Sequence, residues 1–197
     1  DISNTITFFH SSRVANWVVT GQKTADGVAL EEVCSRIHYT GKSGPCFNFR
    51  GQRLARLENL NMVGDNAQPG EIAEHQRNTT KPWNPANWNS DGFSMDRYNV
   101  HSAVAFDWGK DGADGAPWSA TCQVRNMVIT NFVLAISISP NNGYQGDTYG
   151  FDNIKIKHCT YGVSIGQDQA RAVNFSNMWM DGLYCAYTNN EFGRRNG

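Results

Sequence analysis

Four short segments of the chain share one pattern of polar and apolar positions. Each begins with Asn and continues with an apolar, a variable and an apolar residue, and another apolar residue stands two positions before the Asn. The segments are Asn59–Met62, Asn126–Ile129, Asn153–Ile156 and Asn177–Met180, preceded by Leu57, Val124, Phe151 and Phe175. This alternation is typical of a strand. Because it returns roughly every 25 residues over the last three segments, it predicts a solenoid of parallel, stacked coils.

The agreement between segments continues beyond these strands. Three further columns of equivalent residues are Phe132, Cys159 and Leu183, then Ala135, Gly162 and Ala186, then Ile136, Val163 and Tyr187. The order predicts a short strand, a tight corner and a second short strand. We expect the small residues of the middle column to lie at the corner, because the backbone can turn there without room for a side chain.

The repeated Asn has a mechanical interpretation. Identical amides that are stacked about one strand spacing apart, roughly 4.8 Å, can hydrogen-bond along the column and satisfy backbone groups. The alternative is coincidence in a chain that is rich in Asn. A ladder is favoured over coincidence because several columns agree at once.

The remaining chain divides into strands, loops and ends. Further strands are predicted at Thr5–Phe9, Asn16–Val19, Arg36–Tyr39, Cys46–Phe49 and Ala103–Phe106, and Asp26–Cys34 fits either a short helix with Asp26 as N-cap or a strand. We expect residues 1–35 to form an irregular entry segment and residues 36–192 to form the coils, with long insertions at 65–92, 109–119 and 139–150. Residues 193–197 read as a truncated continuation, so we expect a piece of a longer protein.

Composition excludes several classes of function. The 17 basic and 18 acidic residues leave a net charge of −1, which argues against a general nucleic-acid or anionic-membrane surface. No apolar run approaches the roughly 20 residues of a membrane span. The five cysteines form no C-x-x-C pair, and Cys159 and Cys185 fall in buried columns, which fits a reducing compartment without excluding secretion. The histidines are dispersed, and the acidic loop after Asp107 fails the EF-hand pattern, so we expect neither a cofactor nor a metal.

Carboxylates are the first candidates for chemistry. Asp91, Asp96 and Asp107 surround a degenerate coil at residues 93–106, and two of them could form the acid–base pair of a glycosidase. The alternative is that they bond the local backbone in turns. Glu58 and Asp152 align with Arg125 in neighbouring coils, and an ion-pair ladder accounts for them without catalysis.

Aromatic residues in the insertions are candidates for binding. Trp83, Trp88, Trp108, Trp118 and Tyr144 lie in or beside the insertions, among Asn, Asp and Gln. Tryptophan rings stack on the apolar faces of sugars, while amides and carboxylates bond hydroxyls. Alternatively, these rings anchor the loops to the coils or contact another subunit. Trp179 occupies the variable slot of its strand, so we expect it to point away from the core.

The columns resemble the right-handed parallel β-helix, the fold of pectate-lyase-like proteins and of bacteriophage tailspikes. The resemblance rests on residues 36–64 and 120–192, and no catalytic signature of the pectin-degrading families accompanies it. It implies an all-β solenoid that carries a surface for long polysaccharides or forms a rigid virion spike, often as a homotrimer. Fold alone does not fix function.

The leading expectation is therefore a structural virion protein of the tailspike or tail-fibre kind that presents a rigid surface to a host glycan. A polysaccharide lyase or glycoside hydrolase, acting on an acidic or surface polysaccharide, is the first alternative. A bacterial surface adhesin is the second. We expect a virion-tail or extracellular location, and as partners a glycan and either further copies of the chain or other virion proteins.

Overall fold

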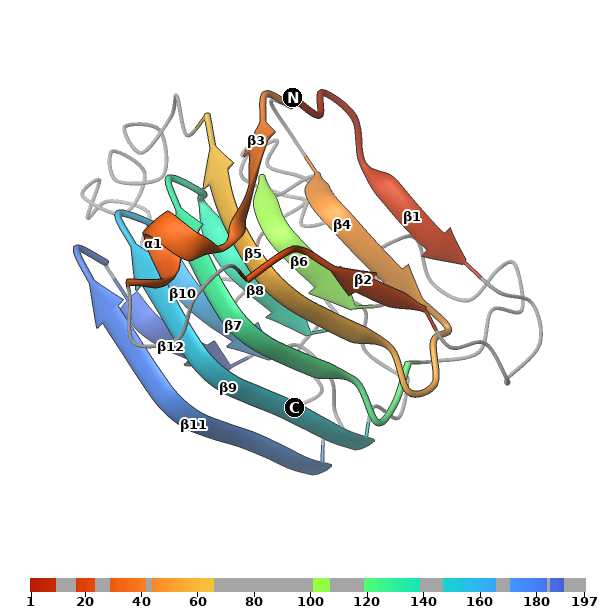
Figure 1. Ribbon diagram of the computed structural model, residues 1–197. Coiled ribbons are helices and arrows are strands. Elements are labelled where there is room, and N and C mark those ends of the chain that lie inside the picture. Colours follow the sequence, from red (N-terminus) through yellow and green to blue (C-terminus); the bar gives the residue numbers. More distant parts are fainter. Residues whose placement is uncertain are drawn as a thin grey trace, which may run out of the picture.

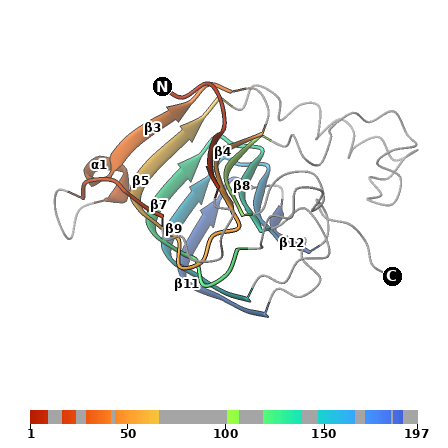
Figure 2. The same ribbon diagram turned by 90° about the vertical axis from the view of Figure 1, so that its right-hand side faces the viewer.

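The fold consists of two parallel β-sheets that face each other (Figures 1 and 2). The computed structural model describes residues 1–9, 17–23, 29–41, 44–65, 101–106, 119–138, 147–165, 171–183 and 185–189. One sheet, sheet A, contains β2 (Val18–Thr20), β3 (Ser35–Tyr39), β5 (Arg56–Gly64), β7 (Gln123–Thr130), β9 (Asp147–Lys157) and β11 (Arg171–Asp181). Sheet B contains β1 (Ile6–Phe9), β4 (Pro45–Arg50), β6 (Ser102–Phe106), β8 (Leu134–Ile138), β10 (Tyr161–Ile165) and β12 (Cys185–Asn189).

From β3 onward, successive strands alternate between the two sheets. Sheet B has the order β1-β4-β6-β8-β10-β12, and sheet A has the order β11-β9-β7-β5-β2, with β3 also paired to β5. Every pairing of named strands is parallel. From β5 onward, each strand therefore lies beside the strand two places earlier in the chain. This arrangement confirms the predicted all-β class and the parallel stacking of the repeated segments.

The register of sheet A matches the columns that the sequence predicts. Leu57 pairs with Val124, Val124 with Phe151, and Phe151 with Phe175. Equivalent residues beyond the Asn pair in the same way, as Met127 does with Ile154. The apolar residues of each of these strands of sheet A thus lie directly over the equivalent apolar residues of the next strand.

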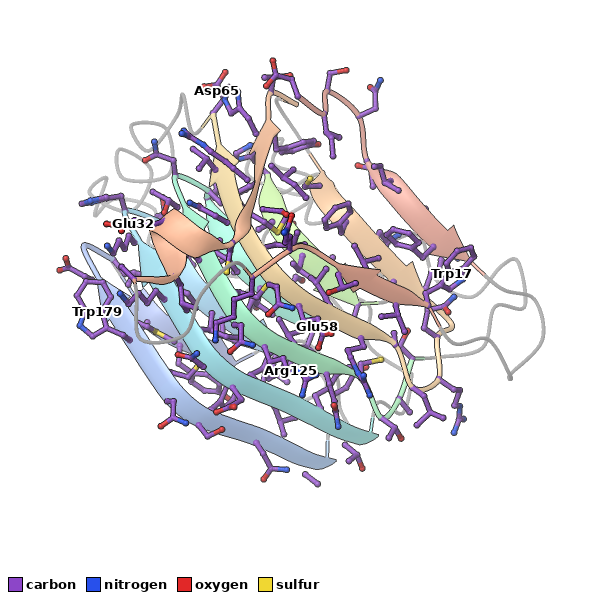
Figure 3. All side chains as sticks on the ribbon, in the orientation of Figure 1. Trp17, Glu32, Glu58, Asp65, Arg125 and Trp179 are labelled. Atoms are coloured by element: carbon purple, nitrogen blue, oxygen red, sulfur yellow. The ribbon has the colours of Figure 1, made fainter. Side chains whose placement is uncertain are left out.

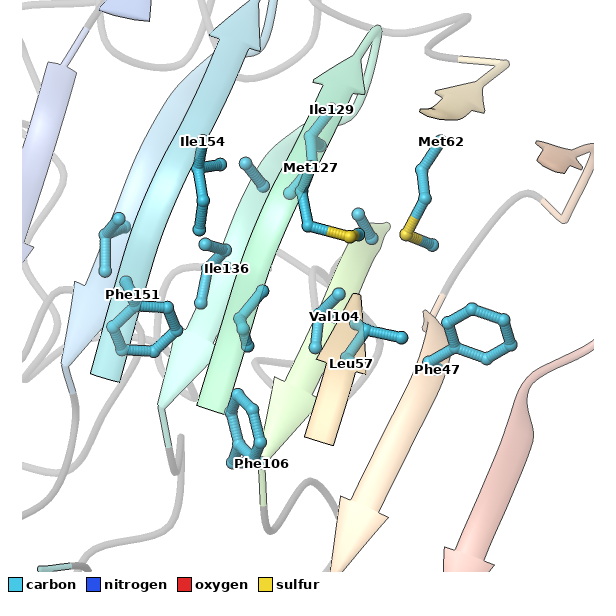
Figure 4. Packing of buried hydrophobic residues seen from close by; sticks show 14 of the residues in the cluster. Phe47, Leu57, Met62, Val104, Phe106, Met127, Ile129, Ile136, Phe151 and Ile154 are labelled. Carbon is cyan, nitrogen blue, oxygen red and sulfur yellow. The ribbon is translucent and has the colours of Figure 1, made fainter. Parts of the chain in front are cut away.

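These columns form the core between the sheets (Figure 4). Labelled residues from sheet A, such as Met127 and Ile154, face residues from sheet B, such as Val104 and Ile136, and all four are buried. Full burial of an aliphatic or aromatic side chain contributes roughly 1.5–3 kcal/mol. Because both sheets direct one residue in two toward the same interior, the stack gains this contribution at every layer.

The turns between the sheets differ from the prediction. Ala135, Gly162 and Ala186 are not corner residues, since each is the second residue of a strand, in β8, β10 and β12. The backbone instead turns four residues earlier, at Asn131, His158 and Gly182, which have φ values of 62°, 51° and 67°. At Gly162 a small residue is needed for a different reason: a Cβ there would lie 2.3 Å from the carbonyl oxygen of Ala186.

The first layer is less regular than the others. The predicted strand at Asn16–Val19 is found as β2, shifted by a residue or two, and the segment Asp26–Cys34 contains the single-turn helix α1 (Leu30–Val33). Ala29 occupies the N-cap position of this helix, so the prediction of Asp26 as the N-cap is wrong. Strands found at β1, β3, β4 and β6 agree with the remaining sequence predictions to within two residues.

Replacing Gly162 by valine should destabilise the protein by about 1–3 kcal/mol, because the new side chain collides with backbone of the neighbouring strand. Gly150 provides a matched control in a strand of the other sheet. A Cβ there would meet only the Cγ of Gln123, at 3.9 Å, so Gly150→Ala should leave stability unchanged or raise it slightly. Urea unfolding followed by circular dichroism measures both effects, and equal midpoints for the two variants would contradict the close approach at Gly162.

Candidate functional site

The repeated asparagines form a hydrogen-bonded ladder across the strands of sheet A. The Nδ2 of Asn126 donates to the Oδ1 of Asn59 over 3.0 Å, and the Nδ2 of Asn153 donates to the Oδ1 of Asn126 over 2.9 Å. These bonds confirm the predicted amide column for three members. The fourth member differs, because the Nδ2 of Asn177 donates to the Oδ1 of Asp152 over 2.9 Å.

All four asparagines also share an unusual backbone conformation. Their φ values are 59°, 51°, 53° and 52°, in the left-handed region. Asn enters this region more readily than most residues because its short polar side chain bonds locally. Each long strand of sheet A is therefore bent at this Asn, and the bends are stacked. The repeated Asn is the feature of the sequence that indicates this bend. β9 and β11 have a second left-handed residue near their start, at Thr148 and Ala172.

A second polar column runs beside the ladder and carries charge. It contains Glu58, Arg125, Asp152 and Ser176, which pair in this order across the four strands. Arg125 forms an ion pair with Glu58 through its Nε, as predicted (Figure 3). Asp152 accepts a hydrogen bond from the Oγ of Ser176 over 2.7 Å.

The hydrogen bonds to Asp152 stabilise its ionised form. The pKa of this carboxyl is lowered from its usual value by the hydrogen bond from Ser176, then by that from Asn177, and to a smaller extent by the charge of Arg125. The carboxylate is exposed and serves as an acceptor that ends the Asn ladder. A group held in this way is suited to fixing neighbours rather than to taking up a proton near neutral pH.

The helix α1 covers part of this outer face. Leu30 and Cys34 pack against Val128 of β7, and the Sγ of Cys34 donates to the backbone oxygen of Asn126 over 3.7 Å. The side chains of β9 and β11 extend beyond the helix. We call their outward residues Asn153, Lys155, Lys157, Asn177 and Trp179 the open half of sheet A.

The open half carries an exposed aromatic ring beside two cations. Trp179 is 46% exposed, as predicted for its slot, and Lys155 pairs directly with it in the neighbouring strand. The Nζ of Lys157 lies 5.2 Å from the centroid of the ring. Such a cation–π contact contributes about 0.5–1 kcal/mol at an exposed site. The contact places one ammonium group beside the indole.

Together these groups can bind a polar ligand along the sheet. Amides supply both donors and acceptors, ammonium groups supply donors, and the indole supplies an apolar platform. The groups lie in columns, spaced by the strand separation of roughly 4.8 Å. This combination suits a hydroxylated, extended ligand better than a compact one.

The cysteines whose side chains are described are buried and are poor candidates for thiol catalysis. They are Cys34, Cys46, Cys122 and Cys159. Burial raises the pKa of both Cys46 and Cys159 to about 12, which keeps these thiols protonated and inert. The predicted burial of Cys159 is confirmed, whereas the side chain of Cys185 lies outside the description.

A shallow cavity at one margin of sheet A is a weaker candidate. Its volume is about 260 Å³, and its lining consists of Val18, Leu54, Ala55, Arg56, Thr121 and Gln123. Ligand pockets usually measure about 300–1,000 Å³ and contain several convergent polar groups. This cavity is smaller than such a pocket, and its surface is mainly apolar although Arg56, Thr121 and Gln123 contribute to it, so the open half remains the better site.

The sites predicted from sequence alone fall in other parts of the chain. The carboxylates Asp91, Asp96 and Asp107 and the aromatic residues Trp83, Trp88, Trp108, Trp118 and Tyr144 all lie outside the described residues. Their roles stay predictions. The sequence pointed to Trp179 as an outward residue, but nothing in it indicated the contact with Lys157, which depends on side-chain directions across two strands.

Two general findings complete the description. In the part of the chain that the structure describes, no group of three or more His, Cys, Asp or Glu residues is placed to hold a metal ion. Within the same residues, no helix is long and apolar enough to cross a membrane.

Comparisons with known proteins gave no relative. No protein-family model matches the chain, and neither curated proteins nor solved structures gave a significant match.

The centre of the Asn ladder should be its most sensitive position. Asn126→Ala removes a donor and an acceptor and forces alanine to adopt a left-handed φ, so we expect a loss of about 2–4 kcal/mol. Asn126→Gly removes the same bonds but tolerates the backbone, and it should cost less. Chemical unfolding of both variants measures the difference, and a cost for glycine as large as that for alanine would contradict a strained backbone here.

Stability should also depend on the ionisation of Asp152. Because the folded-state pKa lies below the unfolded value of about 3.9, the carboxylate contributes stability above that pH and loses it as the pH falls through the folded pKa. Asp152→Asn should therefore flatten the acid limb of the stability curve, and Ser176→Ala should do so partly. Urea midpoints measured from neutral to strongly acidic pH test this, and an unchanged acid limb in both variants would refute it.

Proposed function

We propose that this chain is part of a right-handed parallel β-helix that serves as a structural virion protein of the tailspike or tail-fibre kind. In this proposal, the open half of sheet A contacts a glycan of the host surface. The location is the virion tail or the extracellular space, and the assembly is a homo-oligomer such as a trimer. The chain acts as a rigid scaffold whose polar surface recognises carbohydrate.

The winding of the chain supports the helical part of the proposal. β5 and β7 are adjacent parallel strands of sheet A, and the chain passes from one to the other through β6 in sheet B. The same step recurs from β7 through β8 to β9, and from β9 through β10 to β11. Crossovers between adjacent parallel strands are right-handed in nearly all proteins, which favours a right-handed coil.

The chemistry of the open half supports the glycan-binding part. The main observation is that the exposed ring of Trp179 lies beside Lys155 and Lys157. The Asn ladder stabilises the backbone of the strands in this sheet. Sugars present apolar faces and hydroxyl groups, which match an indole and nearby amides. A rigid platform loses little conformational entropy when it binds, so contacts of modest strength suffice.

Two alternatives share this scaffold. A surface adhesin would use the same face without belonging to a virion. A polysaccharide lyase or glycoside hydrolase would need the carboxylates Asp91, Asp96 and Asp107, which lie outside the described residues. Incubation with capsular, O-antigen and pectic polysaccharides distinguishes the enzyme from the two binding functions, because only an enzyme releases oligosaccharides. If oligosaccharides are released, Asp96→Asn or Asp107→Asn should abolish the release.

Loss of the indole should weaken glycan binding. On a glycan identified by array screening, Trp179→Ala should raise the Kd at least about tenfold, because truncation of a central aromatic contact typically costs more than 1.4 kcal/mol. Trp17 provides the matched control: it is 43% exposed and lies at the opposite side of the molecule (Figure 3), so Trp17→Ala should leave the Kd unchanged. Isothermal titration calorimetry measures both.

Two results would contradict the proposed site. One is glycan binding that is equally affected by both tryptophan substitutions or by neither. The other is an absence of binding to every polysaccharide class tested with a folded protein.

A further inference from the structure

The cavity at the margin of sheet A lies where three parallel strands begin. Val18, Arg56 and Gln123 are the first residues of β2, β5 and β7, and they pair in this order across the sheet. Leu54 and Thr121 line the cavity from positions two residues before β5 and β7. Five of the six lining residues belong to the segments that lead into these two strands. The cavity is therefore formed mainly by inner layers of the stack.

Left-handed residues shape this margin. The φ value is 63° at Leu54 and 55° at Thr121, a conformation that crowds the Cβ of leucine and threonine. Because Thr148 and Ala172 share it in β9 and β11, the conformation belongs to the stack as a whole. Its local consequence concerns Leu54, which is 56% exposed and forms one wall of the cavity.

One side of the cavity is polar and has no partner. Within the part of the chain that the structure describes, no hydrogen bond or ion pair engages the side chains of Arg56, Thr121 or Gln123. The next outward column differs, because the guanidinium of Arg125 there is paired with Glu58. The cavity thus combines a positive charge that these residues do not compensate with a hydroxyl and an amide, each able to donate a hydrogen bond.

The other side of the cavity is apolar. It consists of Val18, Leu54 and Ala55, of which Val18 and Leu54 are exposed. A ligand that covers these two side chains removes apolar surface from water, which favours binding. The volume of about 260 Å³ lies below the usual range of ligand pockets, roughly 300–1,000 Å³, so the ligand must be small.

A carboxylate suits the polar side better than a phosphate does. A guanidinium binds a carboxylate through two parallel N–H···O bonds, and Arg56 is the one cationic residue in the lining. A phosphate group carries more negative charge and a third acceptor oxygen, which a single guanidinium satisfies less completely.

We propose that this cavity binds a small amphipathic monocarboxylate. The carboxylate pairs with Arg56 and accepts hydrogen bonds from Thr121 and Gln123, while the aliphatic chain lies against Val18 and Leu54. The site shares no residue with the open half of sheet A. It is therefore independent of glycan binding.

Hexanoate is the probe, titrated into the isotope-labelled full chain at neutral pH and low salt. We expect saturable shifts of the backbone amide signals of Ala55, Arg56 and Gln123, with a Kd on the order of 1 mM. Hexanamide lacks the charge and should bind at least about tenfold more weakly, because hydrogen bonds to ionised groups are the stronger ones. Acetate should bind at least about tenfold more weakly too, since each buried methylene group contributes about fourfold in affinity.

Two variants test the two sides of the cavity separately. Arg56→Gln should raise the Kd for hexanoate at least about tenfold, to a value near that for hexanamide. Leu54→Asn removes the apolar wall but accepts the left-handed φ, so it should raise the Kd severalfold without loss of stability. Arg36→Gln is the matched control, because Arg36 is an exposed arginine of β3 that does not line the cavity, and it should leave the Kd unchanged. Far-UV circular dichroism and a cooperative urea transition establish that each variant folds.

Three results would overturn the proposal. The first is an absence of saturable shifts at hexanoate concentrations about tenfold above the expected Kd. The second is an equal Kd for hexanoate and hexanamide, or an equal Kd for the unmodified chain and Arg56→Gln. The third is a set of shifts centred on Lys155 and Lys157, which would place the carboxylate on the open half. Failure of the chain to bind any glycan changes none of these outcomes.

Discussion

The left-handed Asn in each long strand of sheet A determines how the layers stack. A strand that bends at one residue can keep its parallel pairing only if its neighbour bends at the same place. Pairing does resume on both sides of the bend: Glu58 pairs with Arg125 before it, and Leu60 pairs with Met127 after it. A slip of one residue would turn every core side chain outward. Asn meets both requirements, since it tolerates the conformation and its amide links the bend to the next one.

This constraint explains which parts of the fold were predictable from sequence. Residues in the stacked columns repeat in type, so the Asn ladder, the apolar columns and the ion pair between Glu58 and Arg125 could be inferred. The turns could not, because Asn131, His158 and Gly182 are chemically unlike and share only a positive φ. Small residues misled the prediction, since a turn and a close approach of two strands favour the same residue types.

The candidate site was predictable only in part, for a related reason. The alternation of a strand shows that Trp179 points outward, but its neighbours depend on the register of sheet A and on side-chain directions. Lys157 is a diagonal neighbour, because the residue directly opposite Trp179 is Lys155. Sequence reasoning instead concentrated on the aromatic residues of the insertions, where composition is most unusual. A regular face carries less signal, because each of its residues also has a structural explanation.

The same interaction holds every described layer to the layer before it. Each layer is held by apolar contact and by parallel strand pairing, and the connection between layers is covalent. Separate molecules lose translational and rotational freedom when they associate, a cost of at least about 4 kcal/mol. Layers of one chain do not bear this cost, so contacts that would be weak between separate molecules are enough to stack them.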